Sequence, residues 1–209
     1  MTATETPLSD ASPSLILASG SRTRAKMLAD AGLHVRVQPA AVDETPVKDG
    51  LLGEGAPPRD IADSLAELKA RNISALYPEA LVIGADQVLA VDGTVMSKSA
   101  SRGDAAEQLA SLAGRTHRLV SAVVLMRGYQ VLWRFVDTAT LAMRPLDASE
   151  IDTYLDRAGD AVLDSVGAYQ LEGLGAQLFD RVSGDFFTIL GLPLLPLLAQ
   201  LRLMGVRVL

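Results

Sequence analysis

The sequence predicts an α/β fold, in which helices and strands share one hydrophobic core. The first observation is residues 81–91, an almost unbroken apolar run rich in Val, Ile and Leu that ends at a turn at 92–93. Such a run is typical of a central strand buried on both faces. The second observation is a pair of strand-like stretches, 116–126 and 130–143, which a short turn joins as an antiparallel pair. Segments with helical periodicity lie between and after these strands.

The chain before the central strand begins with a predicted strand at 14–19. Gly20 breaks this strand, and Ser21 can cap a helix that ends at Gly32. Alternating residues over 33–40 predict a second strand.

A Gly- and Pro-rich stretch, 45–58, predicts a loop or lid. Pro58 then begins a helix, because Ile61, Leu65 and Leu68 form one apolar face at the 3.6-residue period.

The chain after the central strand continues with a return strand at 94–99 and a helix at 102–113. Beyond the antiparallel pair, Asp147 can cap a helix at 148–157. A last apolar helix ends before Gly205.

The composition indicates a globular protein that does not bind nucleic acid. Hydrophobic residues make up 49% of the chain, which is ample for a core, and without cysteine no disulfide or thiol chemistry is available. The net charge of −6 and the aromatic content of 4% argue against a surface for nucleic acids. No apolar run approaches the roughly 18 residues of a membrane span. We expect a flexible leader at 1–13, a single domain at 14–209 and a cytoplasmic location.

Asp86 interrupts the apolar central strand. A buried carboxylate is costly unless it meets a cation, a metal or hydrogen-bond donors, so Asp86 is a candidate functional residue. The alternative is that it only accepts backbone hydrogen bonds at a bend near Gly84.

The junction Ser19-Gly20-Ser21 predicts an anion site. Small residues permit close approach, and the free N–H groups at a helix start attract negative charge. Arg22 and Arg24 follow in the first helical turn, where cations do not favour the helix dipole. An ordinary capped turn with solvated arginines is the alternative.

Further charged residues could complete a phosphate and metal site. Adjacent carboxylates at Asp43 and Glu44 offer the hard oxygen ligands that Mg²⁺ prefers. Lys69 could equally be a solvated surface lysine. Histidine chemistry is limited to His34 and His117, and His117, at a strand start, is more typical of a structural role.

In order and spacing, these short motifs together resemble the Maf family of nucleotide pyrophosphatases over residues 15–203. The matching pieces are Leu17-Ala18-Ser19-Gly20-Ser21 with Arg24, Asp43-Glu44, Lys69-Ala70, Gly84-Ala85-Asp86, Lys98, Gly114 with His117, Gly167-Ala168-Tyr169 and Gly191-Leu192-Pro193. The resemblance implies an elongated mixed sheet in two lobes, with flanking helices and a central nucleotide cleft. A homodimer is also compatible with it.

The resemblance further implies hydrolysis of a nucleoside triphosphate to the monophosphate and pyrophosphate, with Mg²⁺ or Mn²⁺ as cofactor. Asp86 would be the general base and would share the metal with Glu44. The phosphates would lie among the remaining polar residues of the motifs, namely Ser19, Gly20, Ser21, Arg24, Lys69 and Lys98.

The specificity positions, by the same resemblance, point to 7-methyl-GTP and to removal of modified nucleotides. Family members that act on dTTP and UTP carry Thr and Gln where this chain has Gln87 and Glu172. A carboxylate can accept both adjacent donors of guanine, N1–H and the 2-amino group, but would face carbonyl lone pairs on uracil or thymine. Thr23 stands where that branch more often has a large aromatic residue.

Three alternatives remain open at this point. One is a pyrophosphatase of the related inosine-triphosphate type, which the Ser-Gly-Ser and Gly-Ala-Asp segments disfavour. Another is a pyrophosphatase that prefers dTTP or UTP. The third is a non-catalytic, nucleotide-binding regulator of cell division, against which the joint presence of Glu44, Lys69, Asp86 and Lys98 argues.

Overall fold

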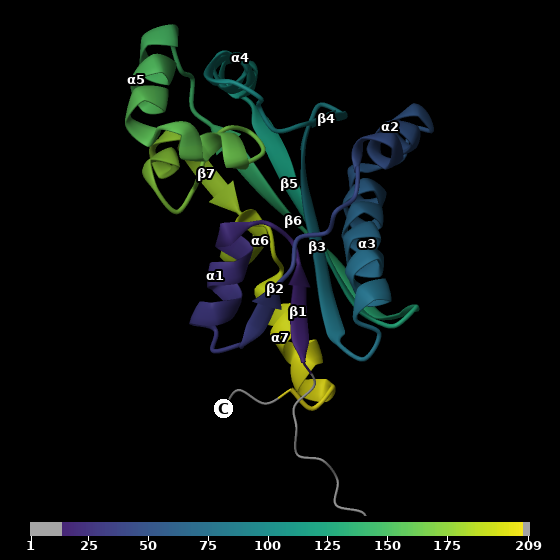
Figure 1. Ribbon diagram of the computed structural model, residues 1–209. Coiled ribbons are helices and arrows are strands. Elements are labelled where there is room, and N and C mark those ends of the chain that lie inside the picture. Colours follow the sequence, from purple (N-terminus) through teal and green to yellow (C-terminus); the bar gives the residue numbers. More distant parts are fainter. Residues whose placement is uncertain (1–13, 207–209) are drawn as a thin grey trace, which may run out of the picture.

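The computed structural model describes residues 14–206, and the leader expected at 1–13 lies outside these residues. Within them, helices flank one mixed, seven-stranded sheet (Figure 1), which confirms the predicted α/β class. None of the helices that the structure describes is both long and apolar enough to cross a membrane.

The sheet has the strand order β2-β1-β3-β5-β6-β7, with β4 paired to the far end of β3. The strands β1, β2 and β3 are parallel to one another, and the remaining pairs are antiparallel. The strands are β1 (Leu15–Ala18), β2 (Val35–Val37), β3 (Leu81–Val91), β4 (Thr94–Met96), β5 (Thr116–Arg127), β6 (Gln130–Met143) and β7 (Phe179–Ser183).

The central strand β3 has two different neighbours along one of its edges. Its first half pairs with β1, ending where Gly84 faces Ala18, and its last three residues pair with β4, beginning where Leu89 faces Met96. Residues 85–88 therefore have no strand beside them on this edge, although they pair with β5 on the other. A local opening in the sheet results.

Side chains in this opening point to both faces, because successive residues of a strand alternate. Asp86 lies on the face of Val82 and Val88, whereas Gln87 lies on the face of Ile83 and Leu89. The strand thus presents one carboxylate and one amide beside the opening, on opposite sides of the sheet.

Three apolar clusters hold the helices on the sheet. One face of the first half carries α3, and the opposite face carries α1 and α7. The second half is covered by α4 and α5, which Figure 1 places at the other end of the sheet. The helices are α1 (Arg22–Asp30), α2 (Thr45–Gly53), α3 (Pro58–Leu76), α4 (Arg102–Leu112), α5 (Ala148–Ala158), α6 (Phe186–Ile189) and α7 (Leu194–Leu203), with 3₁₀ turns η1 (Asp160–Asp164) and η2 (Leu174–Leu178).

Gly84 sets how closely α3 approaches β3. A Cβ atom at this position would lie 2.2 Å from the carbonyl oxygen of Ala66 and 2.9 Å from the backbone nitrogen of Ala70. Both atoms belong to helix backbone and cannot move independently. The absence of a side chain at position 84 therefore brings α3, with Lys69, against the centre of the sheet.

The structure differs from the sequence expectations in a few short elements. The expected loop at 45–58 contains α2, and the strand expected at 33–40 is reduced to the three residues of β2. Neither β7 nor α6 was expected, because each is too short to establish a period. The helix at 148–157 is confirmed as α5, with a complete capping box between Asp147 and Glu150.

We predict that Gly84→Ala lowers the free energy of unfolding by at least about 1–3 kcal/mol, because the added methyl group must push α3 away. Gly103→Ala is the matched control, since a Cβ there meets nothing closer than Ser101 Oγ at 3.7 Å. Denaturant titration of both variants measures the difference. Equal stability of the two would contradict the close approach of α3.

Candidate active site

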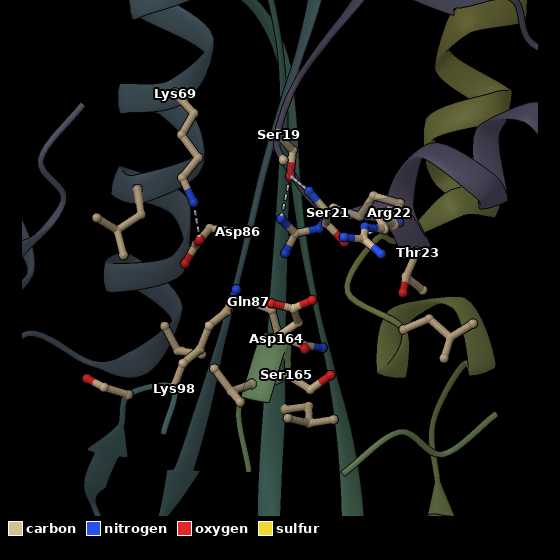
Figure 2. A pocket seen from close by; sticks show the side chains of 18 of the residues that line it. Ser19, Ser21, Arg22, Thr23, Lys69, Asp86, Gln87, Lys98, Asp164 and Ser165 are labelled. Carbon is tan, nitrogen blue, oxygen red and sulfur yellow. Dashed lines mark hydrogen bonds and ion pairs between the residues drawn. The ribbon is translucent and has the colours of Figure 1, made fainter. Parts of the chain in front are cut away.

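A cleft of about 630 Å³ opens where β3 lacks a neighbouring strand. Its size suits a nucleotide-sized ligand. Figure 2 shows Lys69 and Asp86 on one side and the segment Ser19–Thr23 on the other. Of the site residues expected from the sequence, the structure brings all except Asp43 to this cleft, namely Ser19, Gly20, Ser21, Thr23, Arg24, Glu44, Lys69, Asp86, Gln87, Lys98 and Glu172.

Lys69 lies between two carboxylates at the centre of the cleft. Its Nζ lies 2.6 Å from Asp86 Oδ1 and 2.9 Å from Glu44 Oε2. The side chains of Lys69 and Asp86 are only 12% and 11% exposed, so Lys69 is not a solvated surface lysine. The neighbouring Asp43 instead accepts a hydrogen bond from the Thr45 amide and does not line the cleft.

Arg24 is a buried arginine that ties three parts of the fold together. Its Nη1 donates to Ser19 Oγ and to the carbonyl oxygen of Ala85, both at 3.0 Å, and its Nε donates to the carbonyl oxygen of Gly191 at 2.7 Å. Ala85 belongs to the unpaired edge of β3, so the guanidinium replaces a missing strand as donor. Burial lowers the pKa of Arg24, and the nearby charges of Asp86 and Glu44 oppose that shift.

The turn between β1 and α1 has the geometry of an anion site. Ser21 caps α1 by accepting a hydrogen bond from the Arg24 amide, and Ser19 Oγ accepts one from the Ser21 amide. Among the hydrogen bonds of the described residues, the amides of Gly20, Arg22 and Thr23 have no acceptor. Free N–H groups at a helix start favour a bound anion.

Hydrogen bonds hold the side-chain amide of Gln87 in one orientation, on the face of the sheet opposite to Asp86. Its Nε2 lies 2.9 Å from Ser121 Oγ and 3.1 and 3.0 Å from the carbonyl oxygens of Thr188 and Ile189. Carbonyl oxygens only accept, so the amide nitrogen must face them. The side-chain oxygen of Gln87 has no donor among the described residues and is not fully buried. It is therefore available to the cleft as an acceptor.

The remaining rim of the cleft comes from segments far apart in the chain. Lys98, which follows β4, forms an isolated bridge with Val166 and so brings the segment from η1 to Glu172 across the opening. This pairing adds Asp164 and Ser165, which the sequence analysis missed (Figure 2). It also missed Lys48 of α2, because the whole segment was expected to be a loop.

Charge in the cleft differs from that of the whole chain. The lining cations are Arg22, Arg24, Lys48, Lys69 and Lys98, and the lining carboxylates are Glu44, Asp86, Asp164 and Glu172. Among the described residues, only Lys69 of these five cations has a carboxylate within 4 Å. A locally positive site therefore exists in a chain with a net charge of −6.

The pair Glu44 and Asp86 fits a divalent cation in part. Both carboxylates reach one ammonium group, so they already converge on a position that holds positive charge. Within residues 14–206 no cluster of three His, Cys, Asp or Glu side chains could hold a metal alone. Mg²⁺ commonly uses one or two carboxylates together with water and substrate phosphates, so two protein ligands are sufficient.

Known proteins of one family are similar to this chain over most of its length. Residues 14–204 match the family described as Maf-like protein. A protein named 7-methyl-GTP pyrophosphatase from Rhizobium meliloti is 49% identical over 92% of this chain and 97% of its own length. A protein named nucleoside triphosphate pyrophosphatase from Paramagnetospirillum magneticum is 54% identical over 90% of this chain and 96% of its own length.

His117 lies outside the cleft and is buried, with 1% of its surface exposed. Its Nε2 lies 2.7 Å from the hydroxyl of Tyr169, and Nδ1 has no partner among the described residues. Desolvation lowers the pKa of His117 to about 4, so the ring is neutral near pH 7. The geometry indicates a structural residue.

We predict that His117 makes the fold less stable as the pH falls from about 6.5 to 4. Between pH 6.5 and 4, His117 takes up a proton in the unfolded chain but stays mostly neutral in the folded protein. Above pH 6.5 the imidazole is neutral in both states. Wild type should therefore lose about 2–3 kcal/mol more than His117→Phe between pH 7.5 and 4. Denaturant titrations across this range measure it, and parallel curves for the two proteins would exclude the effect.

Proposed function

The chain belongs to the Maf family, and from this premise we propose that its cleft hydrolyses a nucleoside triphosphate to the monophosphate and pyrophosphate. Its enzyme class is that of a nucleoside triphosphate pyrophosphatase, a hydrolase acting on acid anhydrides, in keeping with the names of its relatives. The observation that carries the proposal is a nearly buried carboxylate, Asp86, which contacts Lys69 in a cleft that further lysines and arginines line.

Asp86 is the residue best placed to act as general base. It would accept a proton from the attacking water while the water oxygen bonds to the α-phosphorus and the bond to the β-phosphate oxygen breaks. The chain has no cysteine, and hydrolysis of this kind needs positioning and charge neutralisation rather than a covalent nucleophile. Lys69 would hold Asp86 in position through their 2.6 Å contact.

Mg²⁺ or Mn²⁺ would be held by Glu44 and Asp86. Both are carboxylates, which these hard cations prefer, and both already face a common cation position. Bound there, the ion would neutralise charge on the phosphate oxygens. Lys69 would then be released from part of its contact with the carboxylates and could turn to a phosphate.

The phosphate chain would be bound between the β1–α1 turn and the lysines opposite it. Gly20 leaves room for an anion, since a Cβ there would meet only Pro39 at 3.8 Å. The free amides beside Gly20 and the side chains of Ser19 and Ser21 would form one wall. Arg24 and Lys98 would supply positive charge, although most of the Arg24 donors already serve the fold.

Two rival functions are less well supported by these observations. A regulator without turnover would not need Glu44, Lys69 and Asp86 to meet at one point, as they do. The inosine-triphosphate type is disfavoured by the match of 14–204 to the Maf-like family.

Base recognition would rest on two acceptors. Gln87 offers a fixed side-chain oxygen, and Glu172 offers an exposed carboxylate on the rim. Guanine presents two adjacent donors, and methylation at N7 adds positive charge that strengthens a contact with a carboxylate. Thr23 lines the same cleft but has no ring to stack on a base.

We predict that Asp86→Asn folds normally but loses at least about 10²–10⁴-fold in kcat, because an amide cannot accept the proton. Asp43→Asn is the matched control, since it removes the same charge nearby, outside the cleft. Steady-state kinetics with pyrophosphate detection, together with thermal unfolding, separate catalysis from folding. Near wild-type turnover of Asp86→Asn would exclude Asp86 as the base.

We further predict that 7-methyl-GTP or another modified purine exceeds dTTP and UTP in kcat/KM by roughly 10- to 100-fold, the effect of leaving Glu172 unpaired once a bound base covers it. Glu172→Gln should reduce this ratio. The measurement is release of pyrophosphate from 7-methyl-GTP, GTP, UTP and dTTP, each with Mg²⁺ and with Mn²⁺. A preference for either pyrimidine would refute the role of Glu172, and a nucleoside diphosphate as the main product would refute the reaction itself.

A further inference from the structure

Lys48 of α2 reaches across the mouth of the cleft to a segment on the far side. Its Nζ donates to Ser97 Oγ at 2.6 Å. Ser97 directly precedes Lys98, and all three residues line the cleft. The contact therefore joins two segments of the cleft lining, α2 and the segment after β4.

The partner of Lys48 is neutral. Within the part of the chain that the structure describes, no carboxylate lies within 4 Å of its ammonium group, whereas Lys69 contacts two. A hydroxyl oxygen binds an ammonium group less strongly than a phosphate oxygen does, because only the phosphate carries the opposite charge. A phosphate chain in the cleft would compete with Ser97 for Lys48.

The helix that carries Lys48 is lightly attached to the rest of the fold. No residue of α2 is buried, and its apolar contacts are those of Val47 and Leu51, which are partly buried against the cluster under α3. Segments with so little buried surface move at low cost. Glu44 stands at the N-cap of α2, and its carboxylate contacts Lys69 instead of capping the helix.

We propose that Lys48 is a further substrate-binding residue, which α2 carries from Ser97 onto the phosphate chain of the nucleotide. This rests on the proposed function, since it requires a polyphosphate in the cleft. Lys48 then joins Arg22, Arg24 and Lys98 as a fourth cation of the cleft that has no carboxylate within 4 Å among the described residues. It is carried there by α2, a helix without buried residues.

The test compares Lys48→Met, which keeps the length but removes the charge, with Lys48→Arg and Ser97→Ala. Titration calorimetry with inorganic tripolyphosphate gives binding, and steady-state kinetics give KM for the nucleoside triphosphate. Lys48→Met should weaken tripolyphosphate binding and raise KM, each by about 10-fold, the effect of one charged hydrogen bond. Lys48→Arg should keep most of the affinity, and Ser97→Ala should bind as tightly as wild type or more tightly.

Two results would overturn the proposal. If Lys48→Met and Ser97→Ala weakened tripolyphosphate binding equally, the contact between the two residues would have only a structural role. If Lys48→Met bound tripolyphosphate as tightly as wild type, Lys48 would not belong to the phosphate site. The calorimetric experiment needs no turnover. A wild-type protein that binds tripolyphosphate through Lys48 but hydrolyses no nucleotide would sink the proposed function and leave this assignment standing.

Discussion

The interrupted pairing along one edge of β3 is the constraint on which the site depends. Because β1 ends opposite Gly84 and β4 begins opposite Leu89, four residues of a buried strand keep an open edge. An open edge inside a protein leaves backbone groups without partners, which is costly. Arg24 compensates for this by donating to the carbonyl oxygen of Ala85, so the residue that stabilises the opening also places a cation beside it.

Burial of Arg24 is tolerated because its donors are used by acceptors from separate parts of the chain. Ser19, Ala85 and Gly191 come from the turn after β1, the central strand β3 and the segment after α6. The same α6 segment is held from the other side by Gln87, through the carbonyl oxygens of Thr188 and Ile189. Two side chains that line the cleft thus fix a helix of only four residues.

The sequence predicted the long helices and strands and most of the residues that line the cleft. It did not predict the contacts between these residues. Strong periodicity located β3, α3 and the β5–β6 pair, and the Maf-like motifs brought together the residues of the site. The Gly and Pro residues of the stretch 45–58 predicted a loop in place of α2, and so Lys48 was missed. The contacts of Arg24 with Gly191 and of Lys69 with Glu44 depend on tertiary packing, and no local pattern records that packing.

The charge distribution of the cleft also bears on how ligands arrive. Among the described residues, its lining carries five cations and four carboxylates, so the acidic excess of the chain lies entirely elsewhere. Such a local excess of cations favours the approach of small anions to the cleft and speeds their capture at low ionic strength. Added salt screens these charges, so the cations of the lining contribute most to the capture of an anion in dilute buffer.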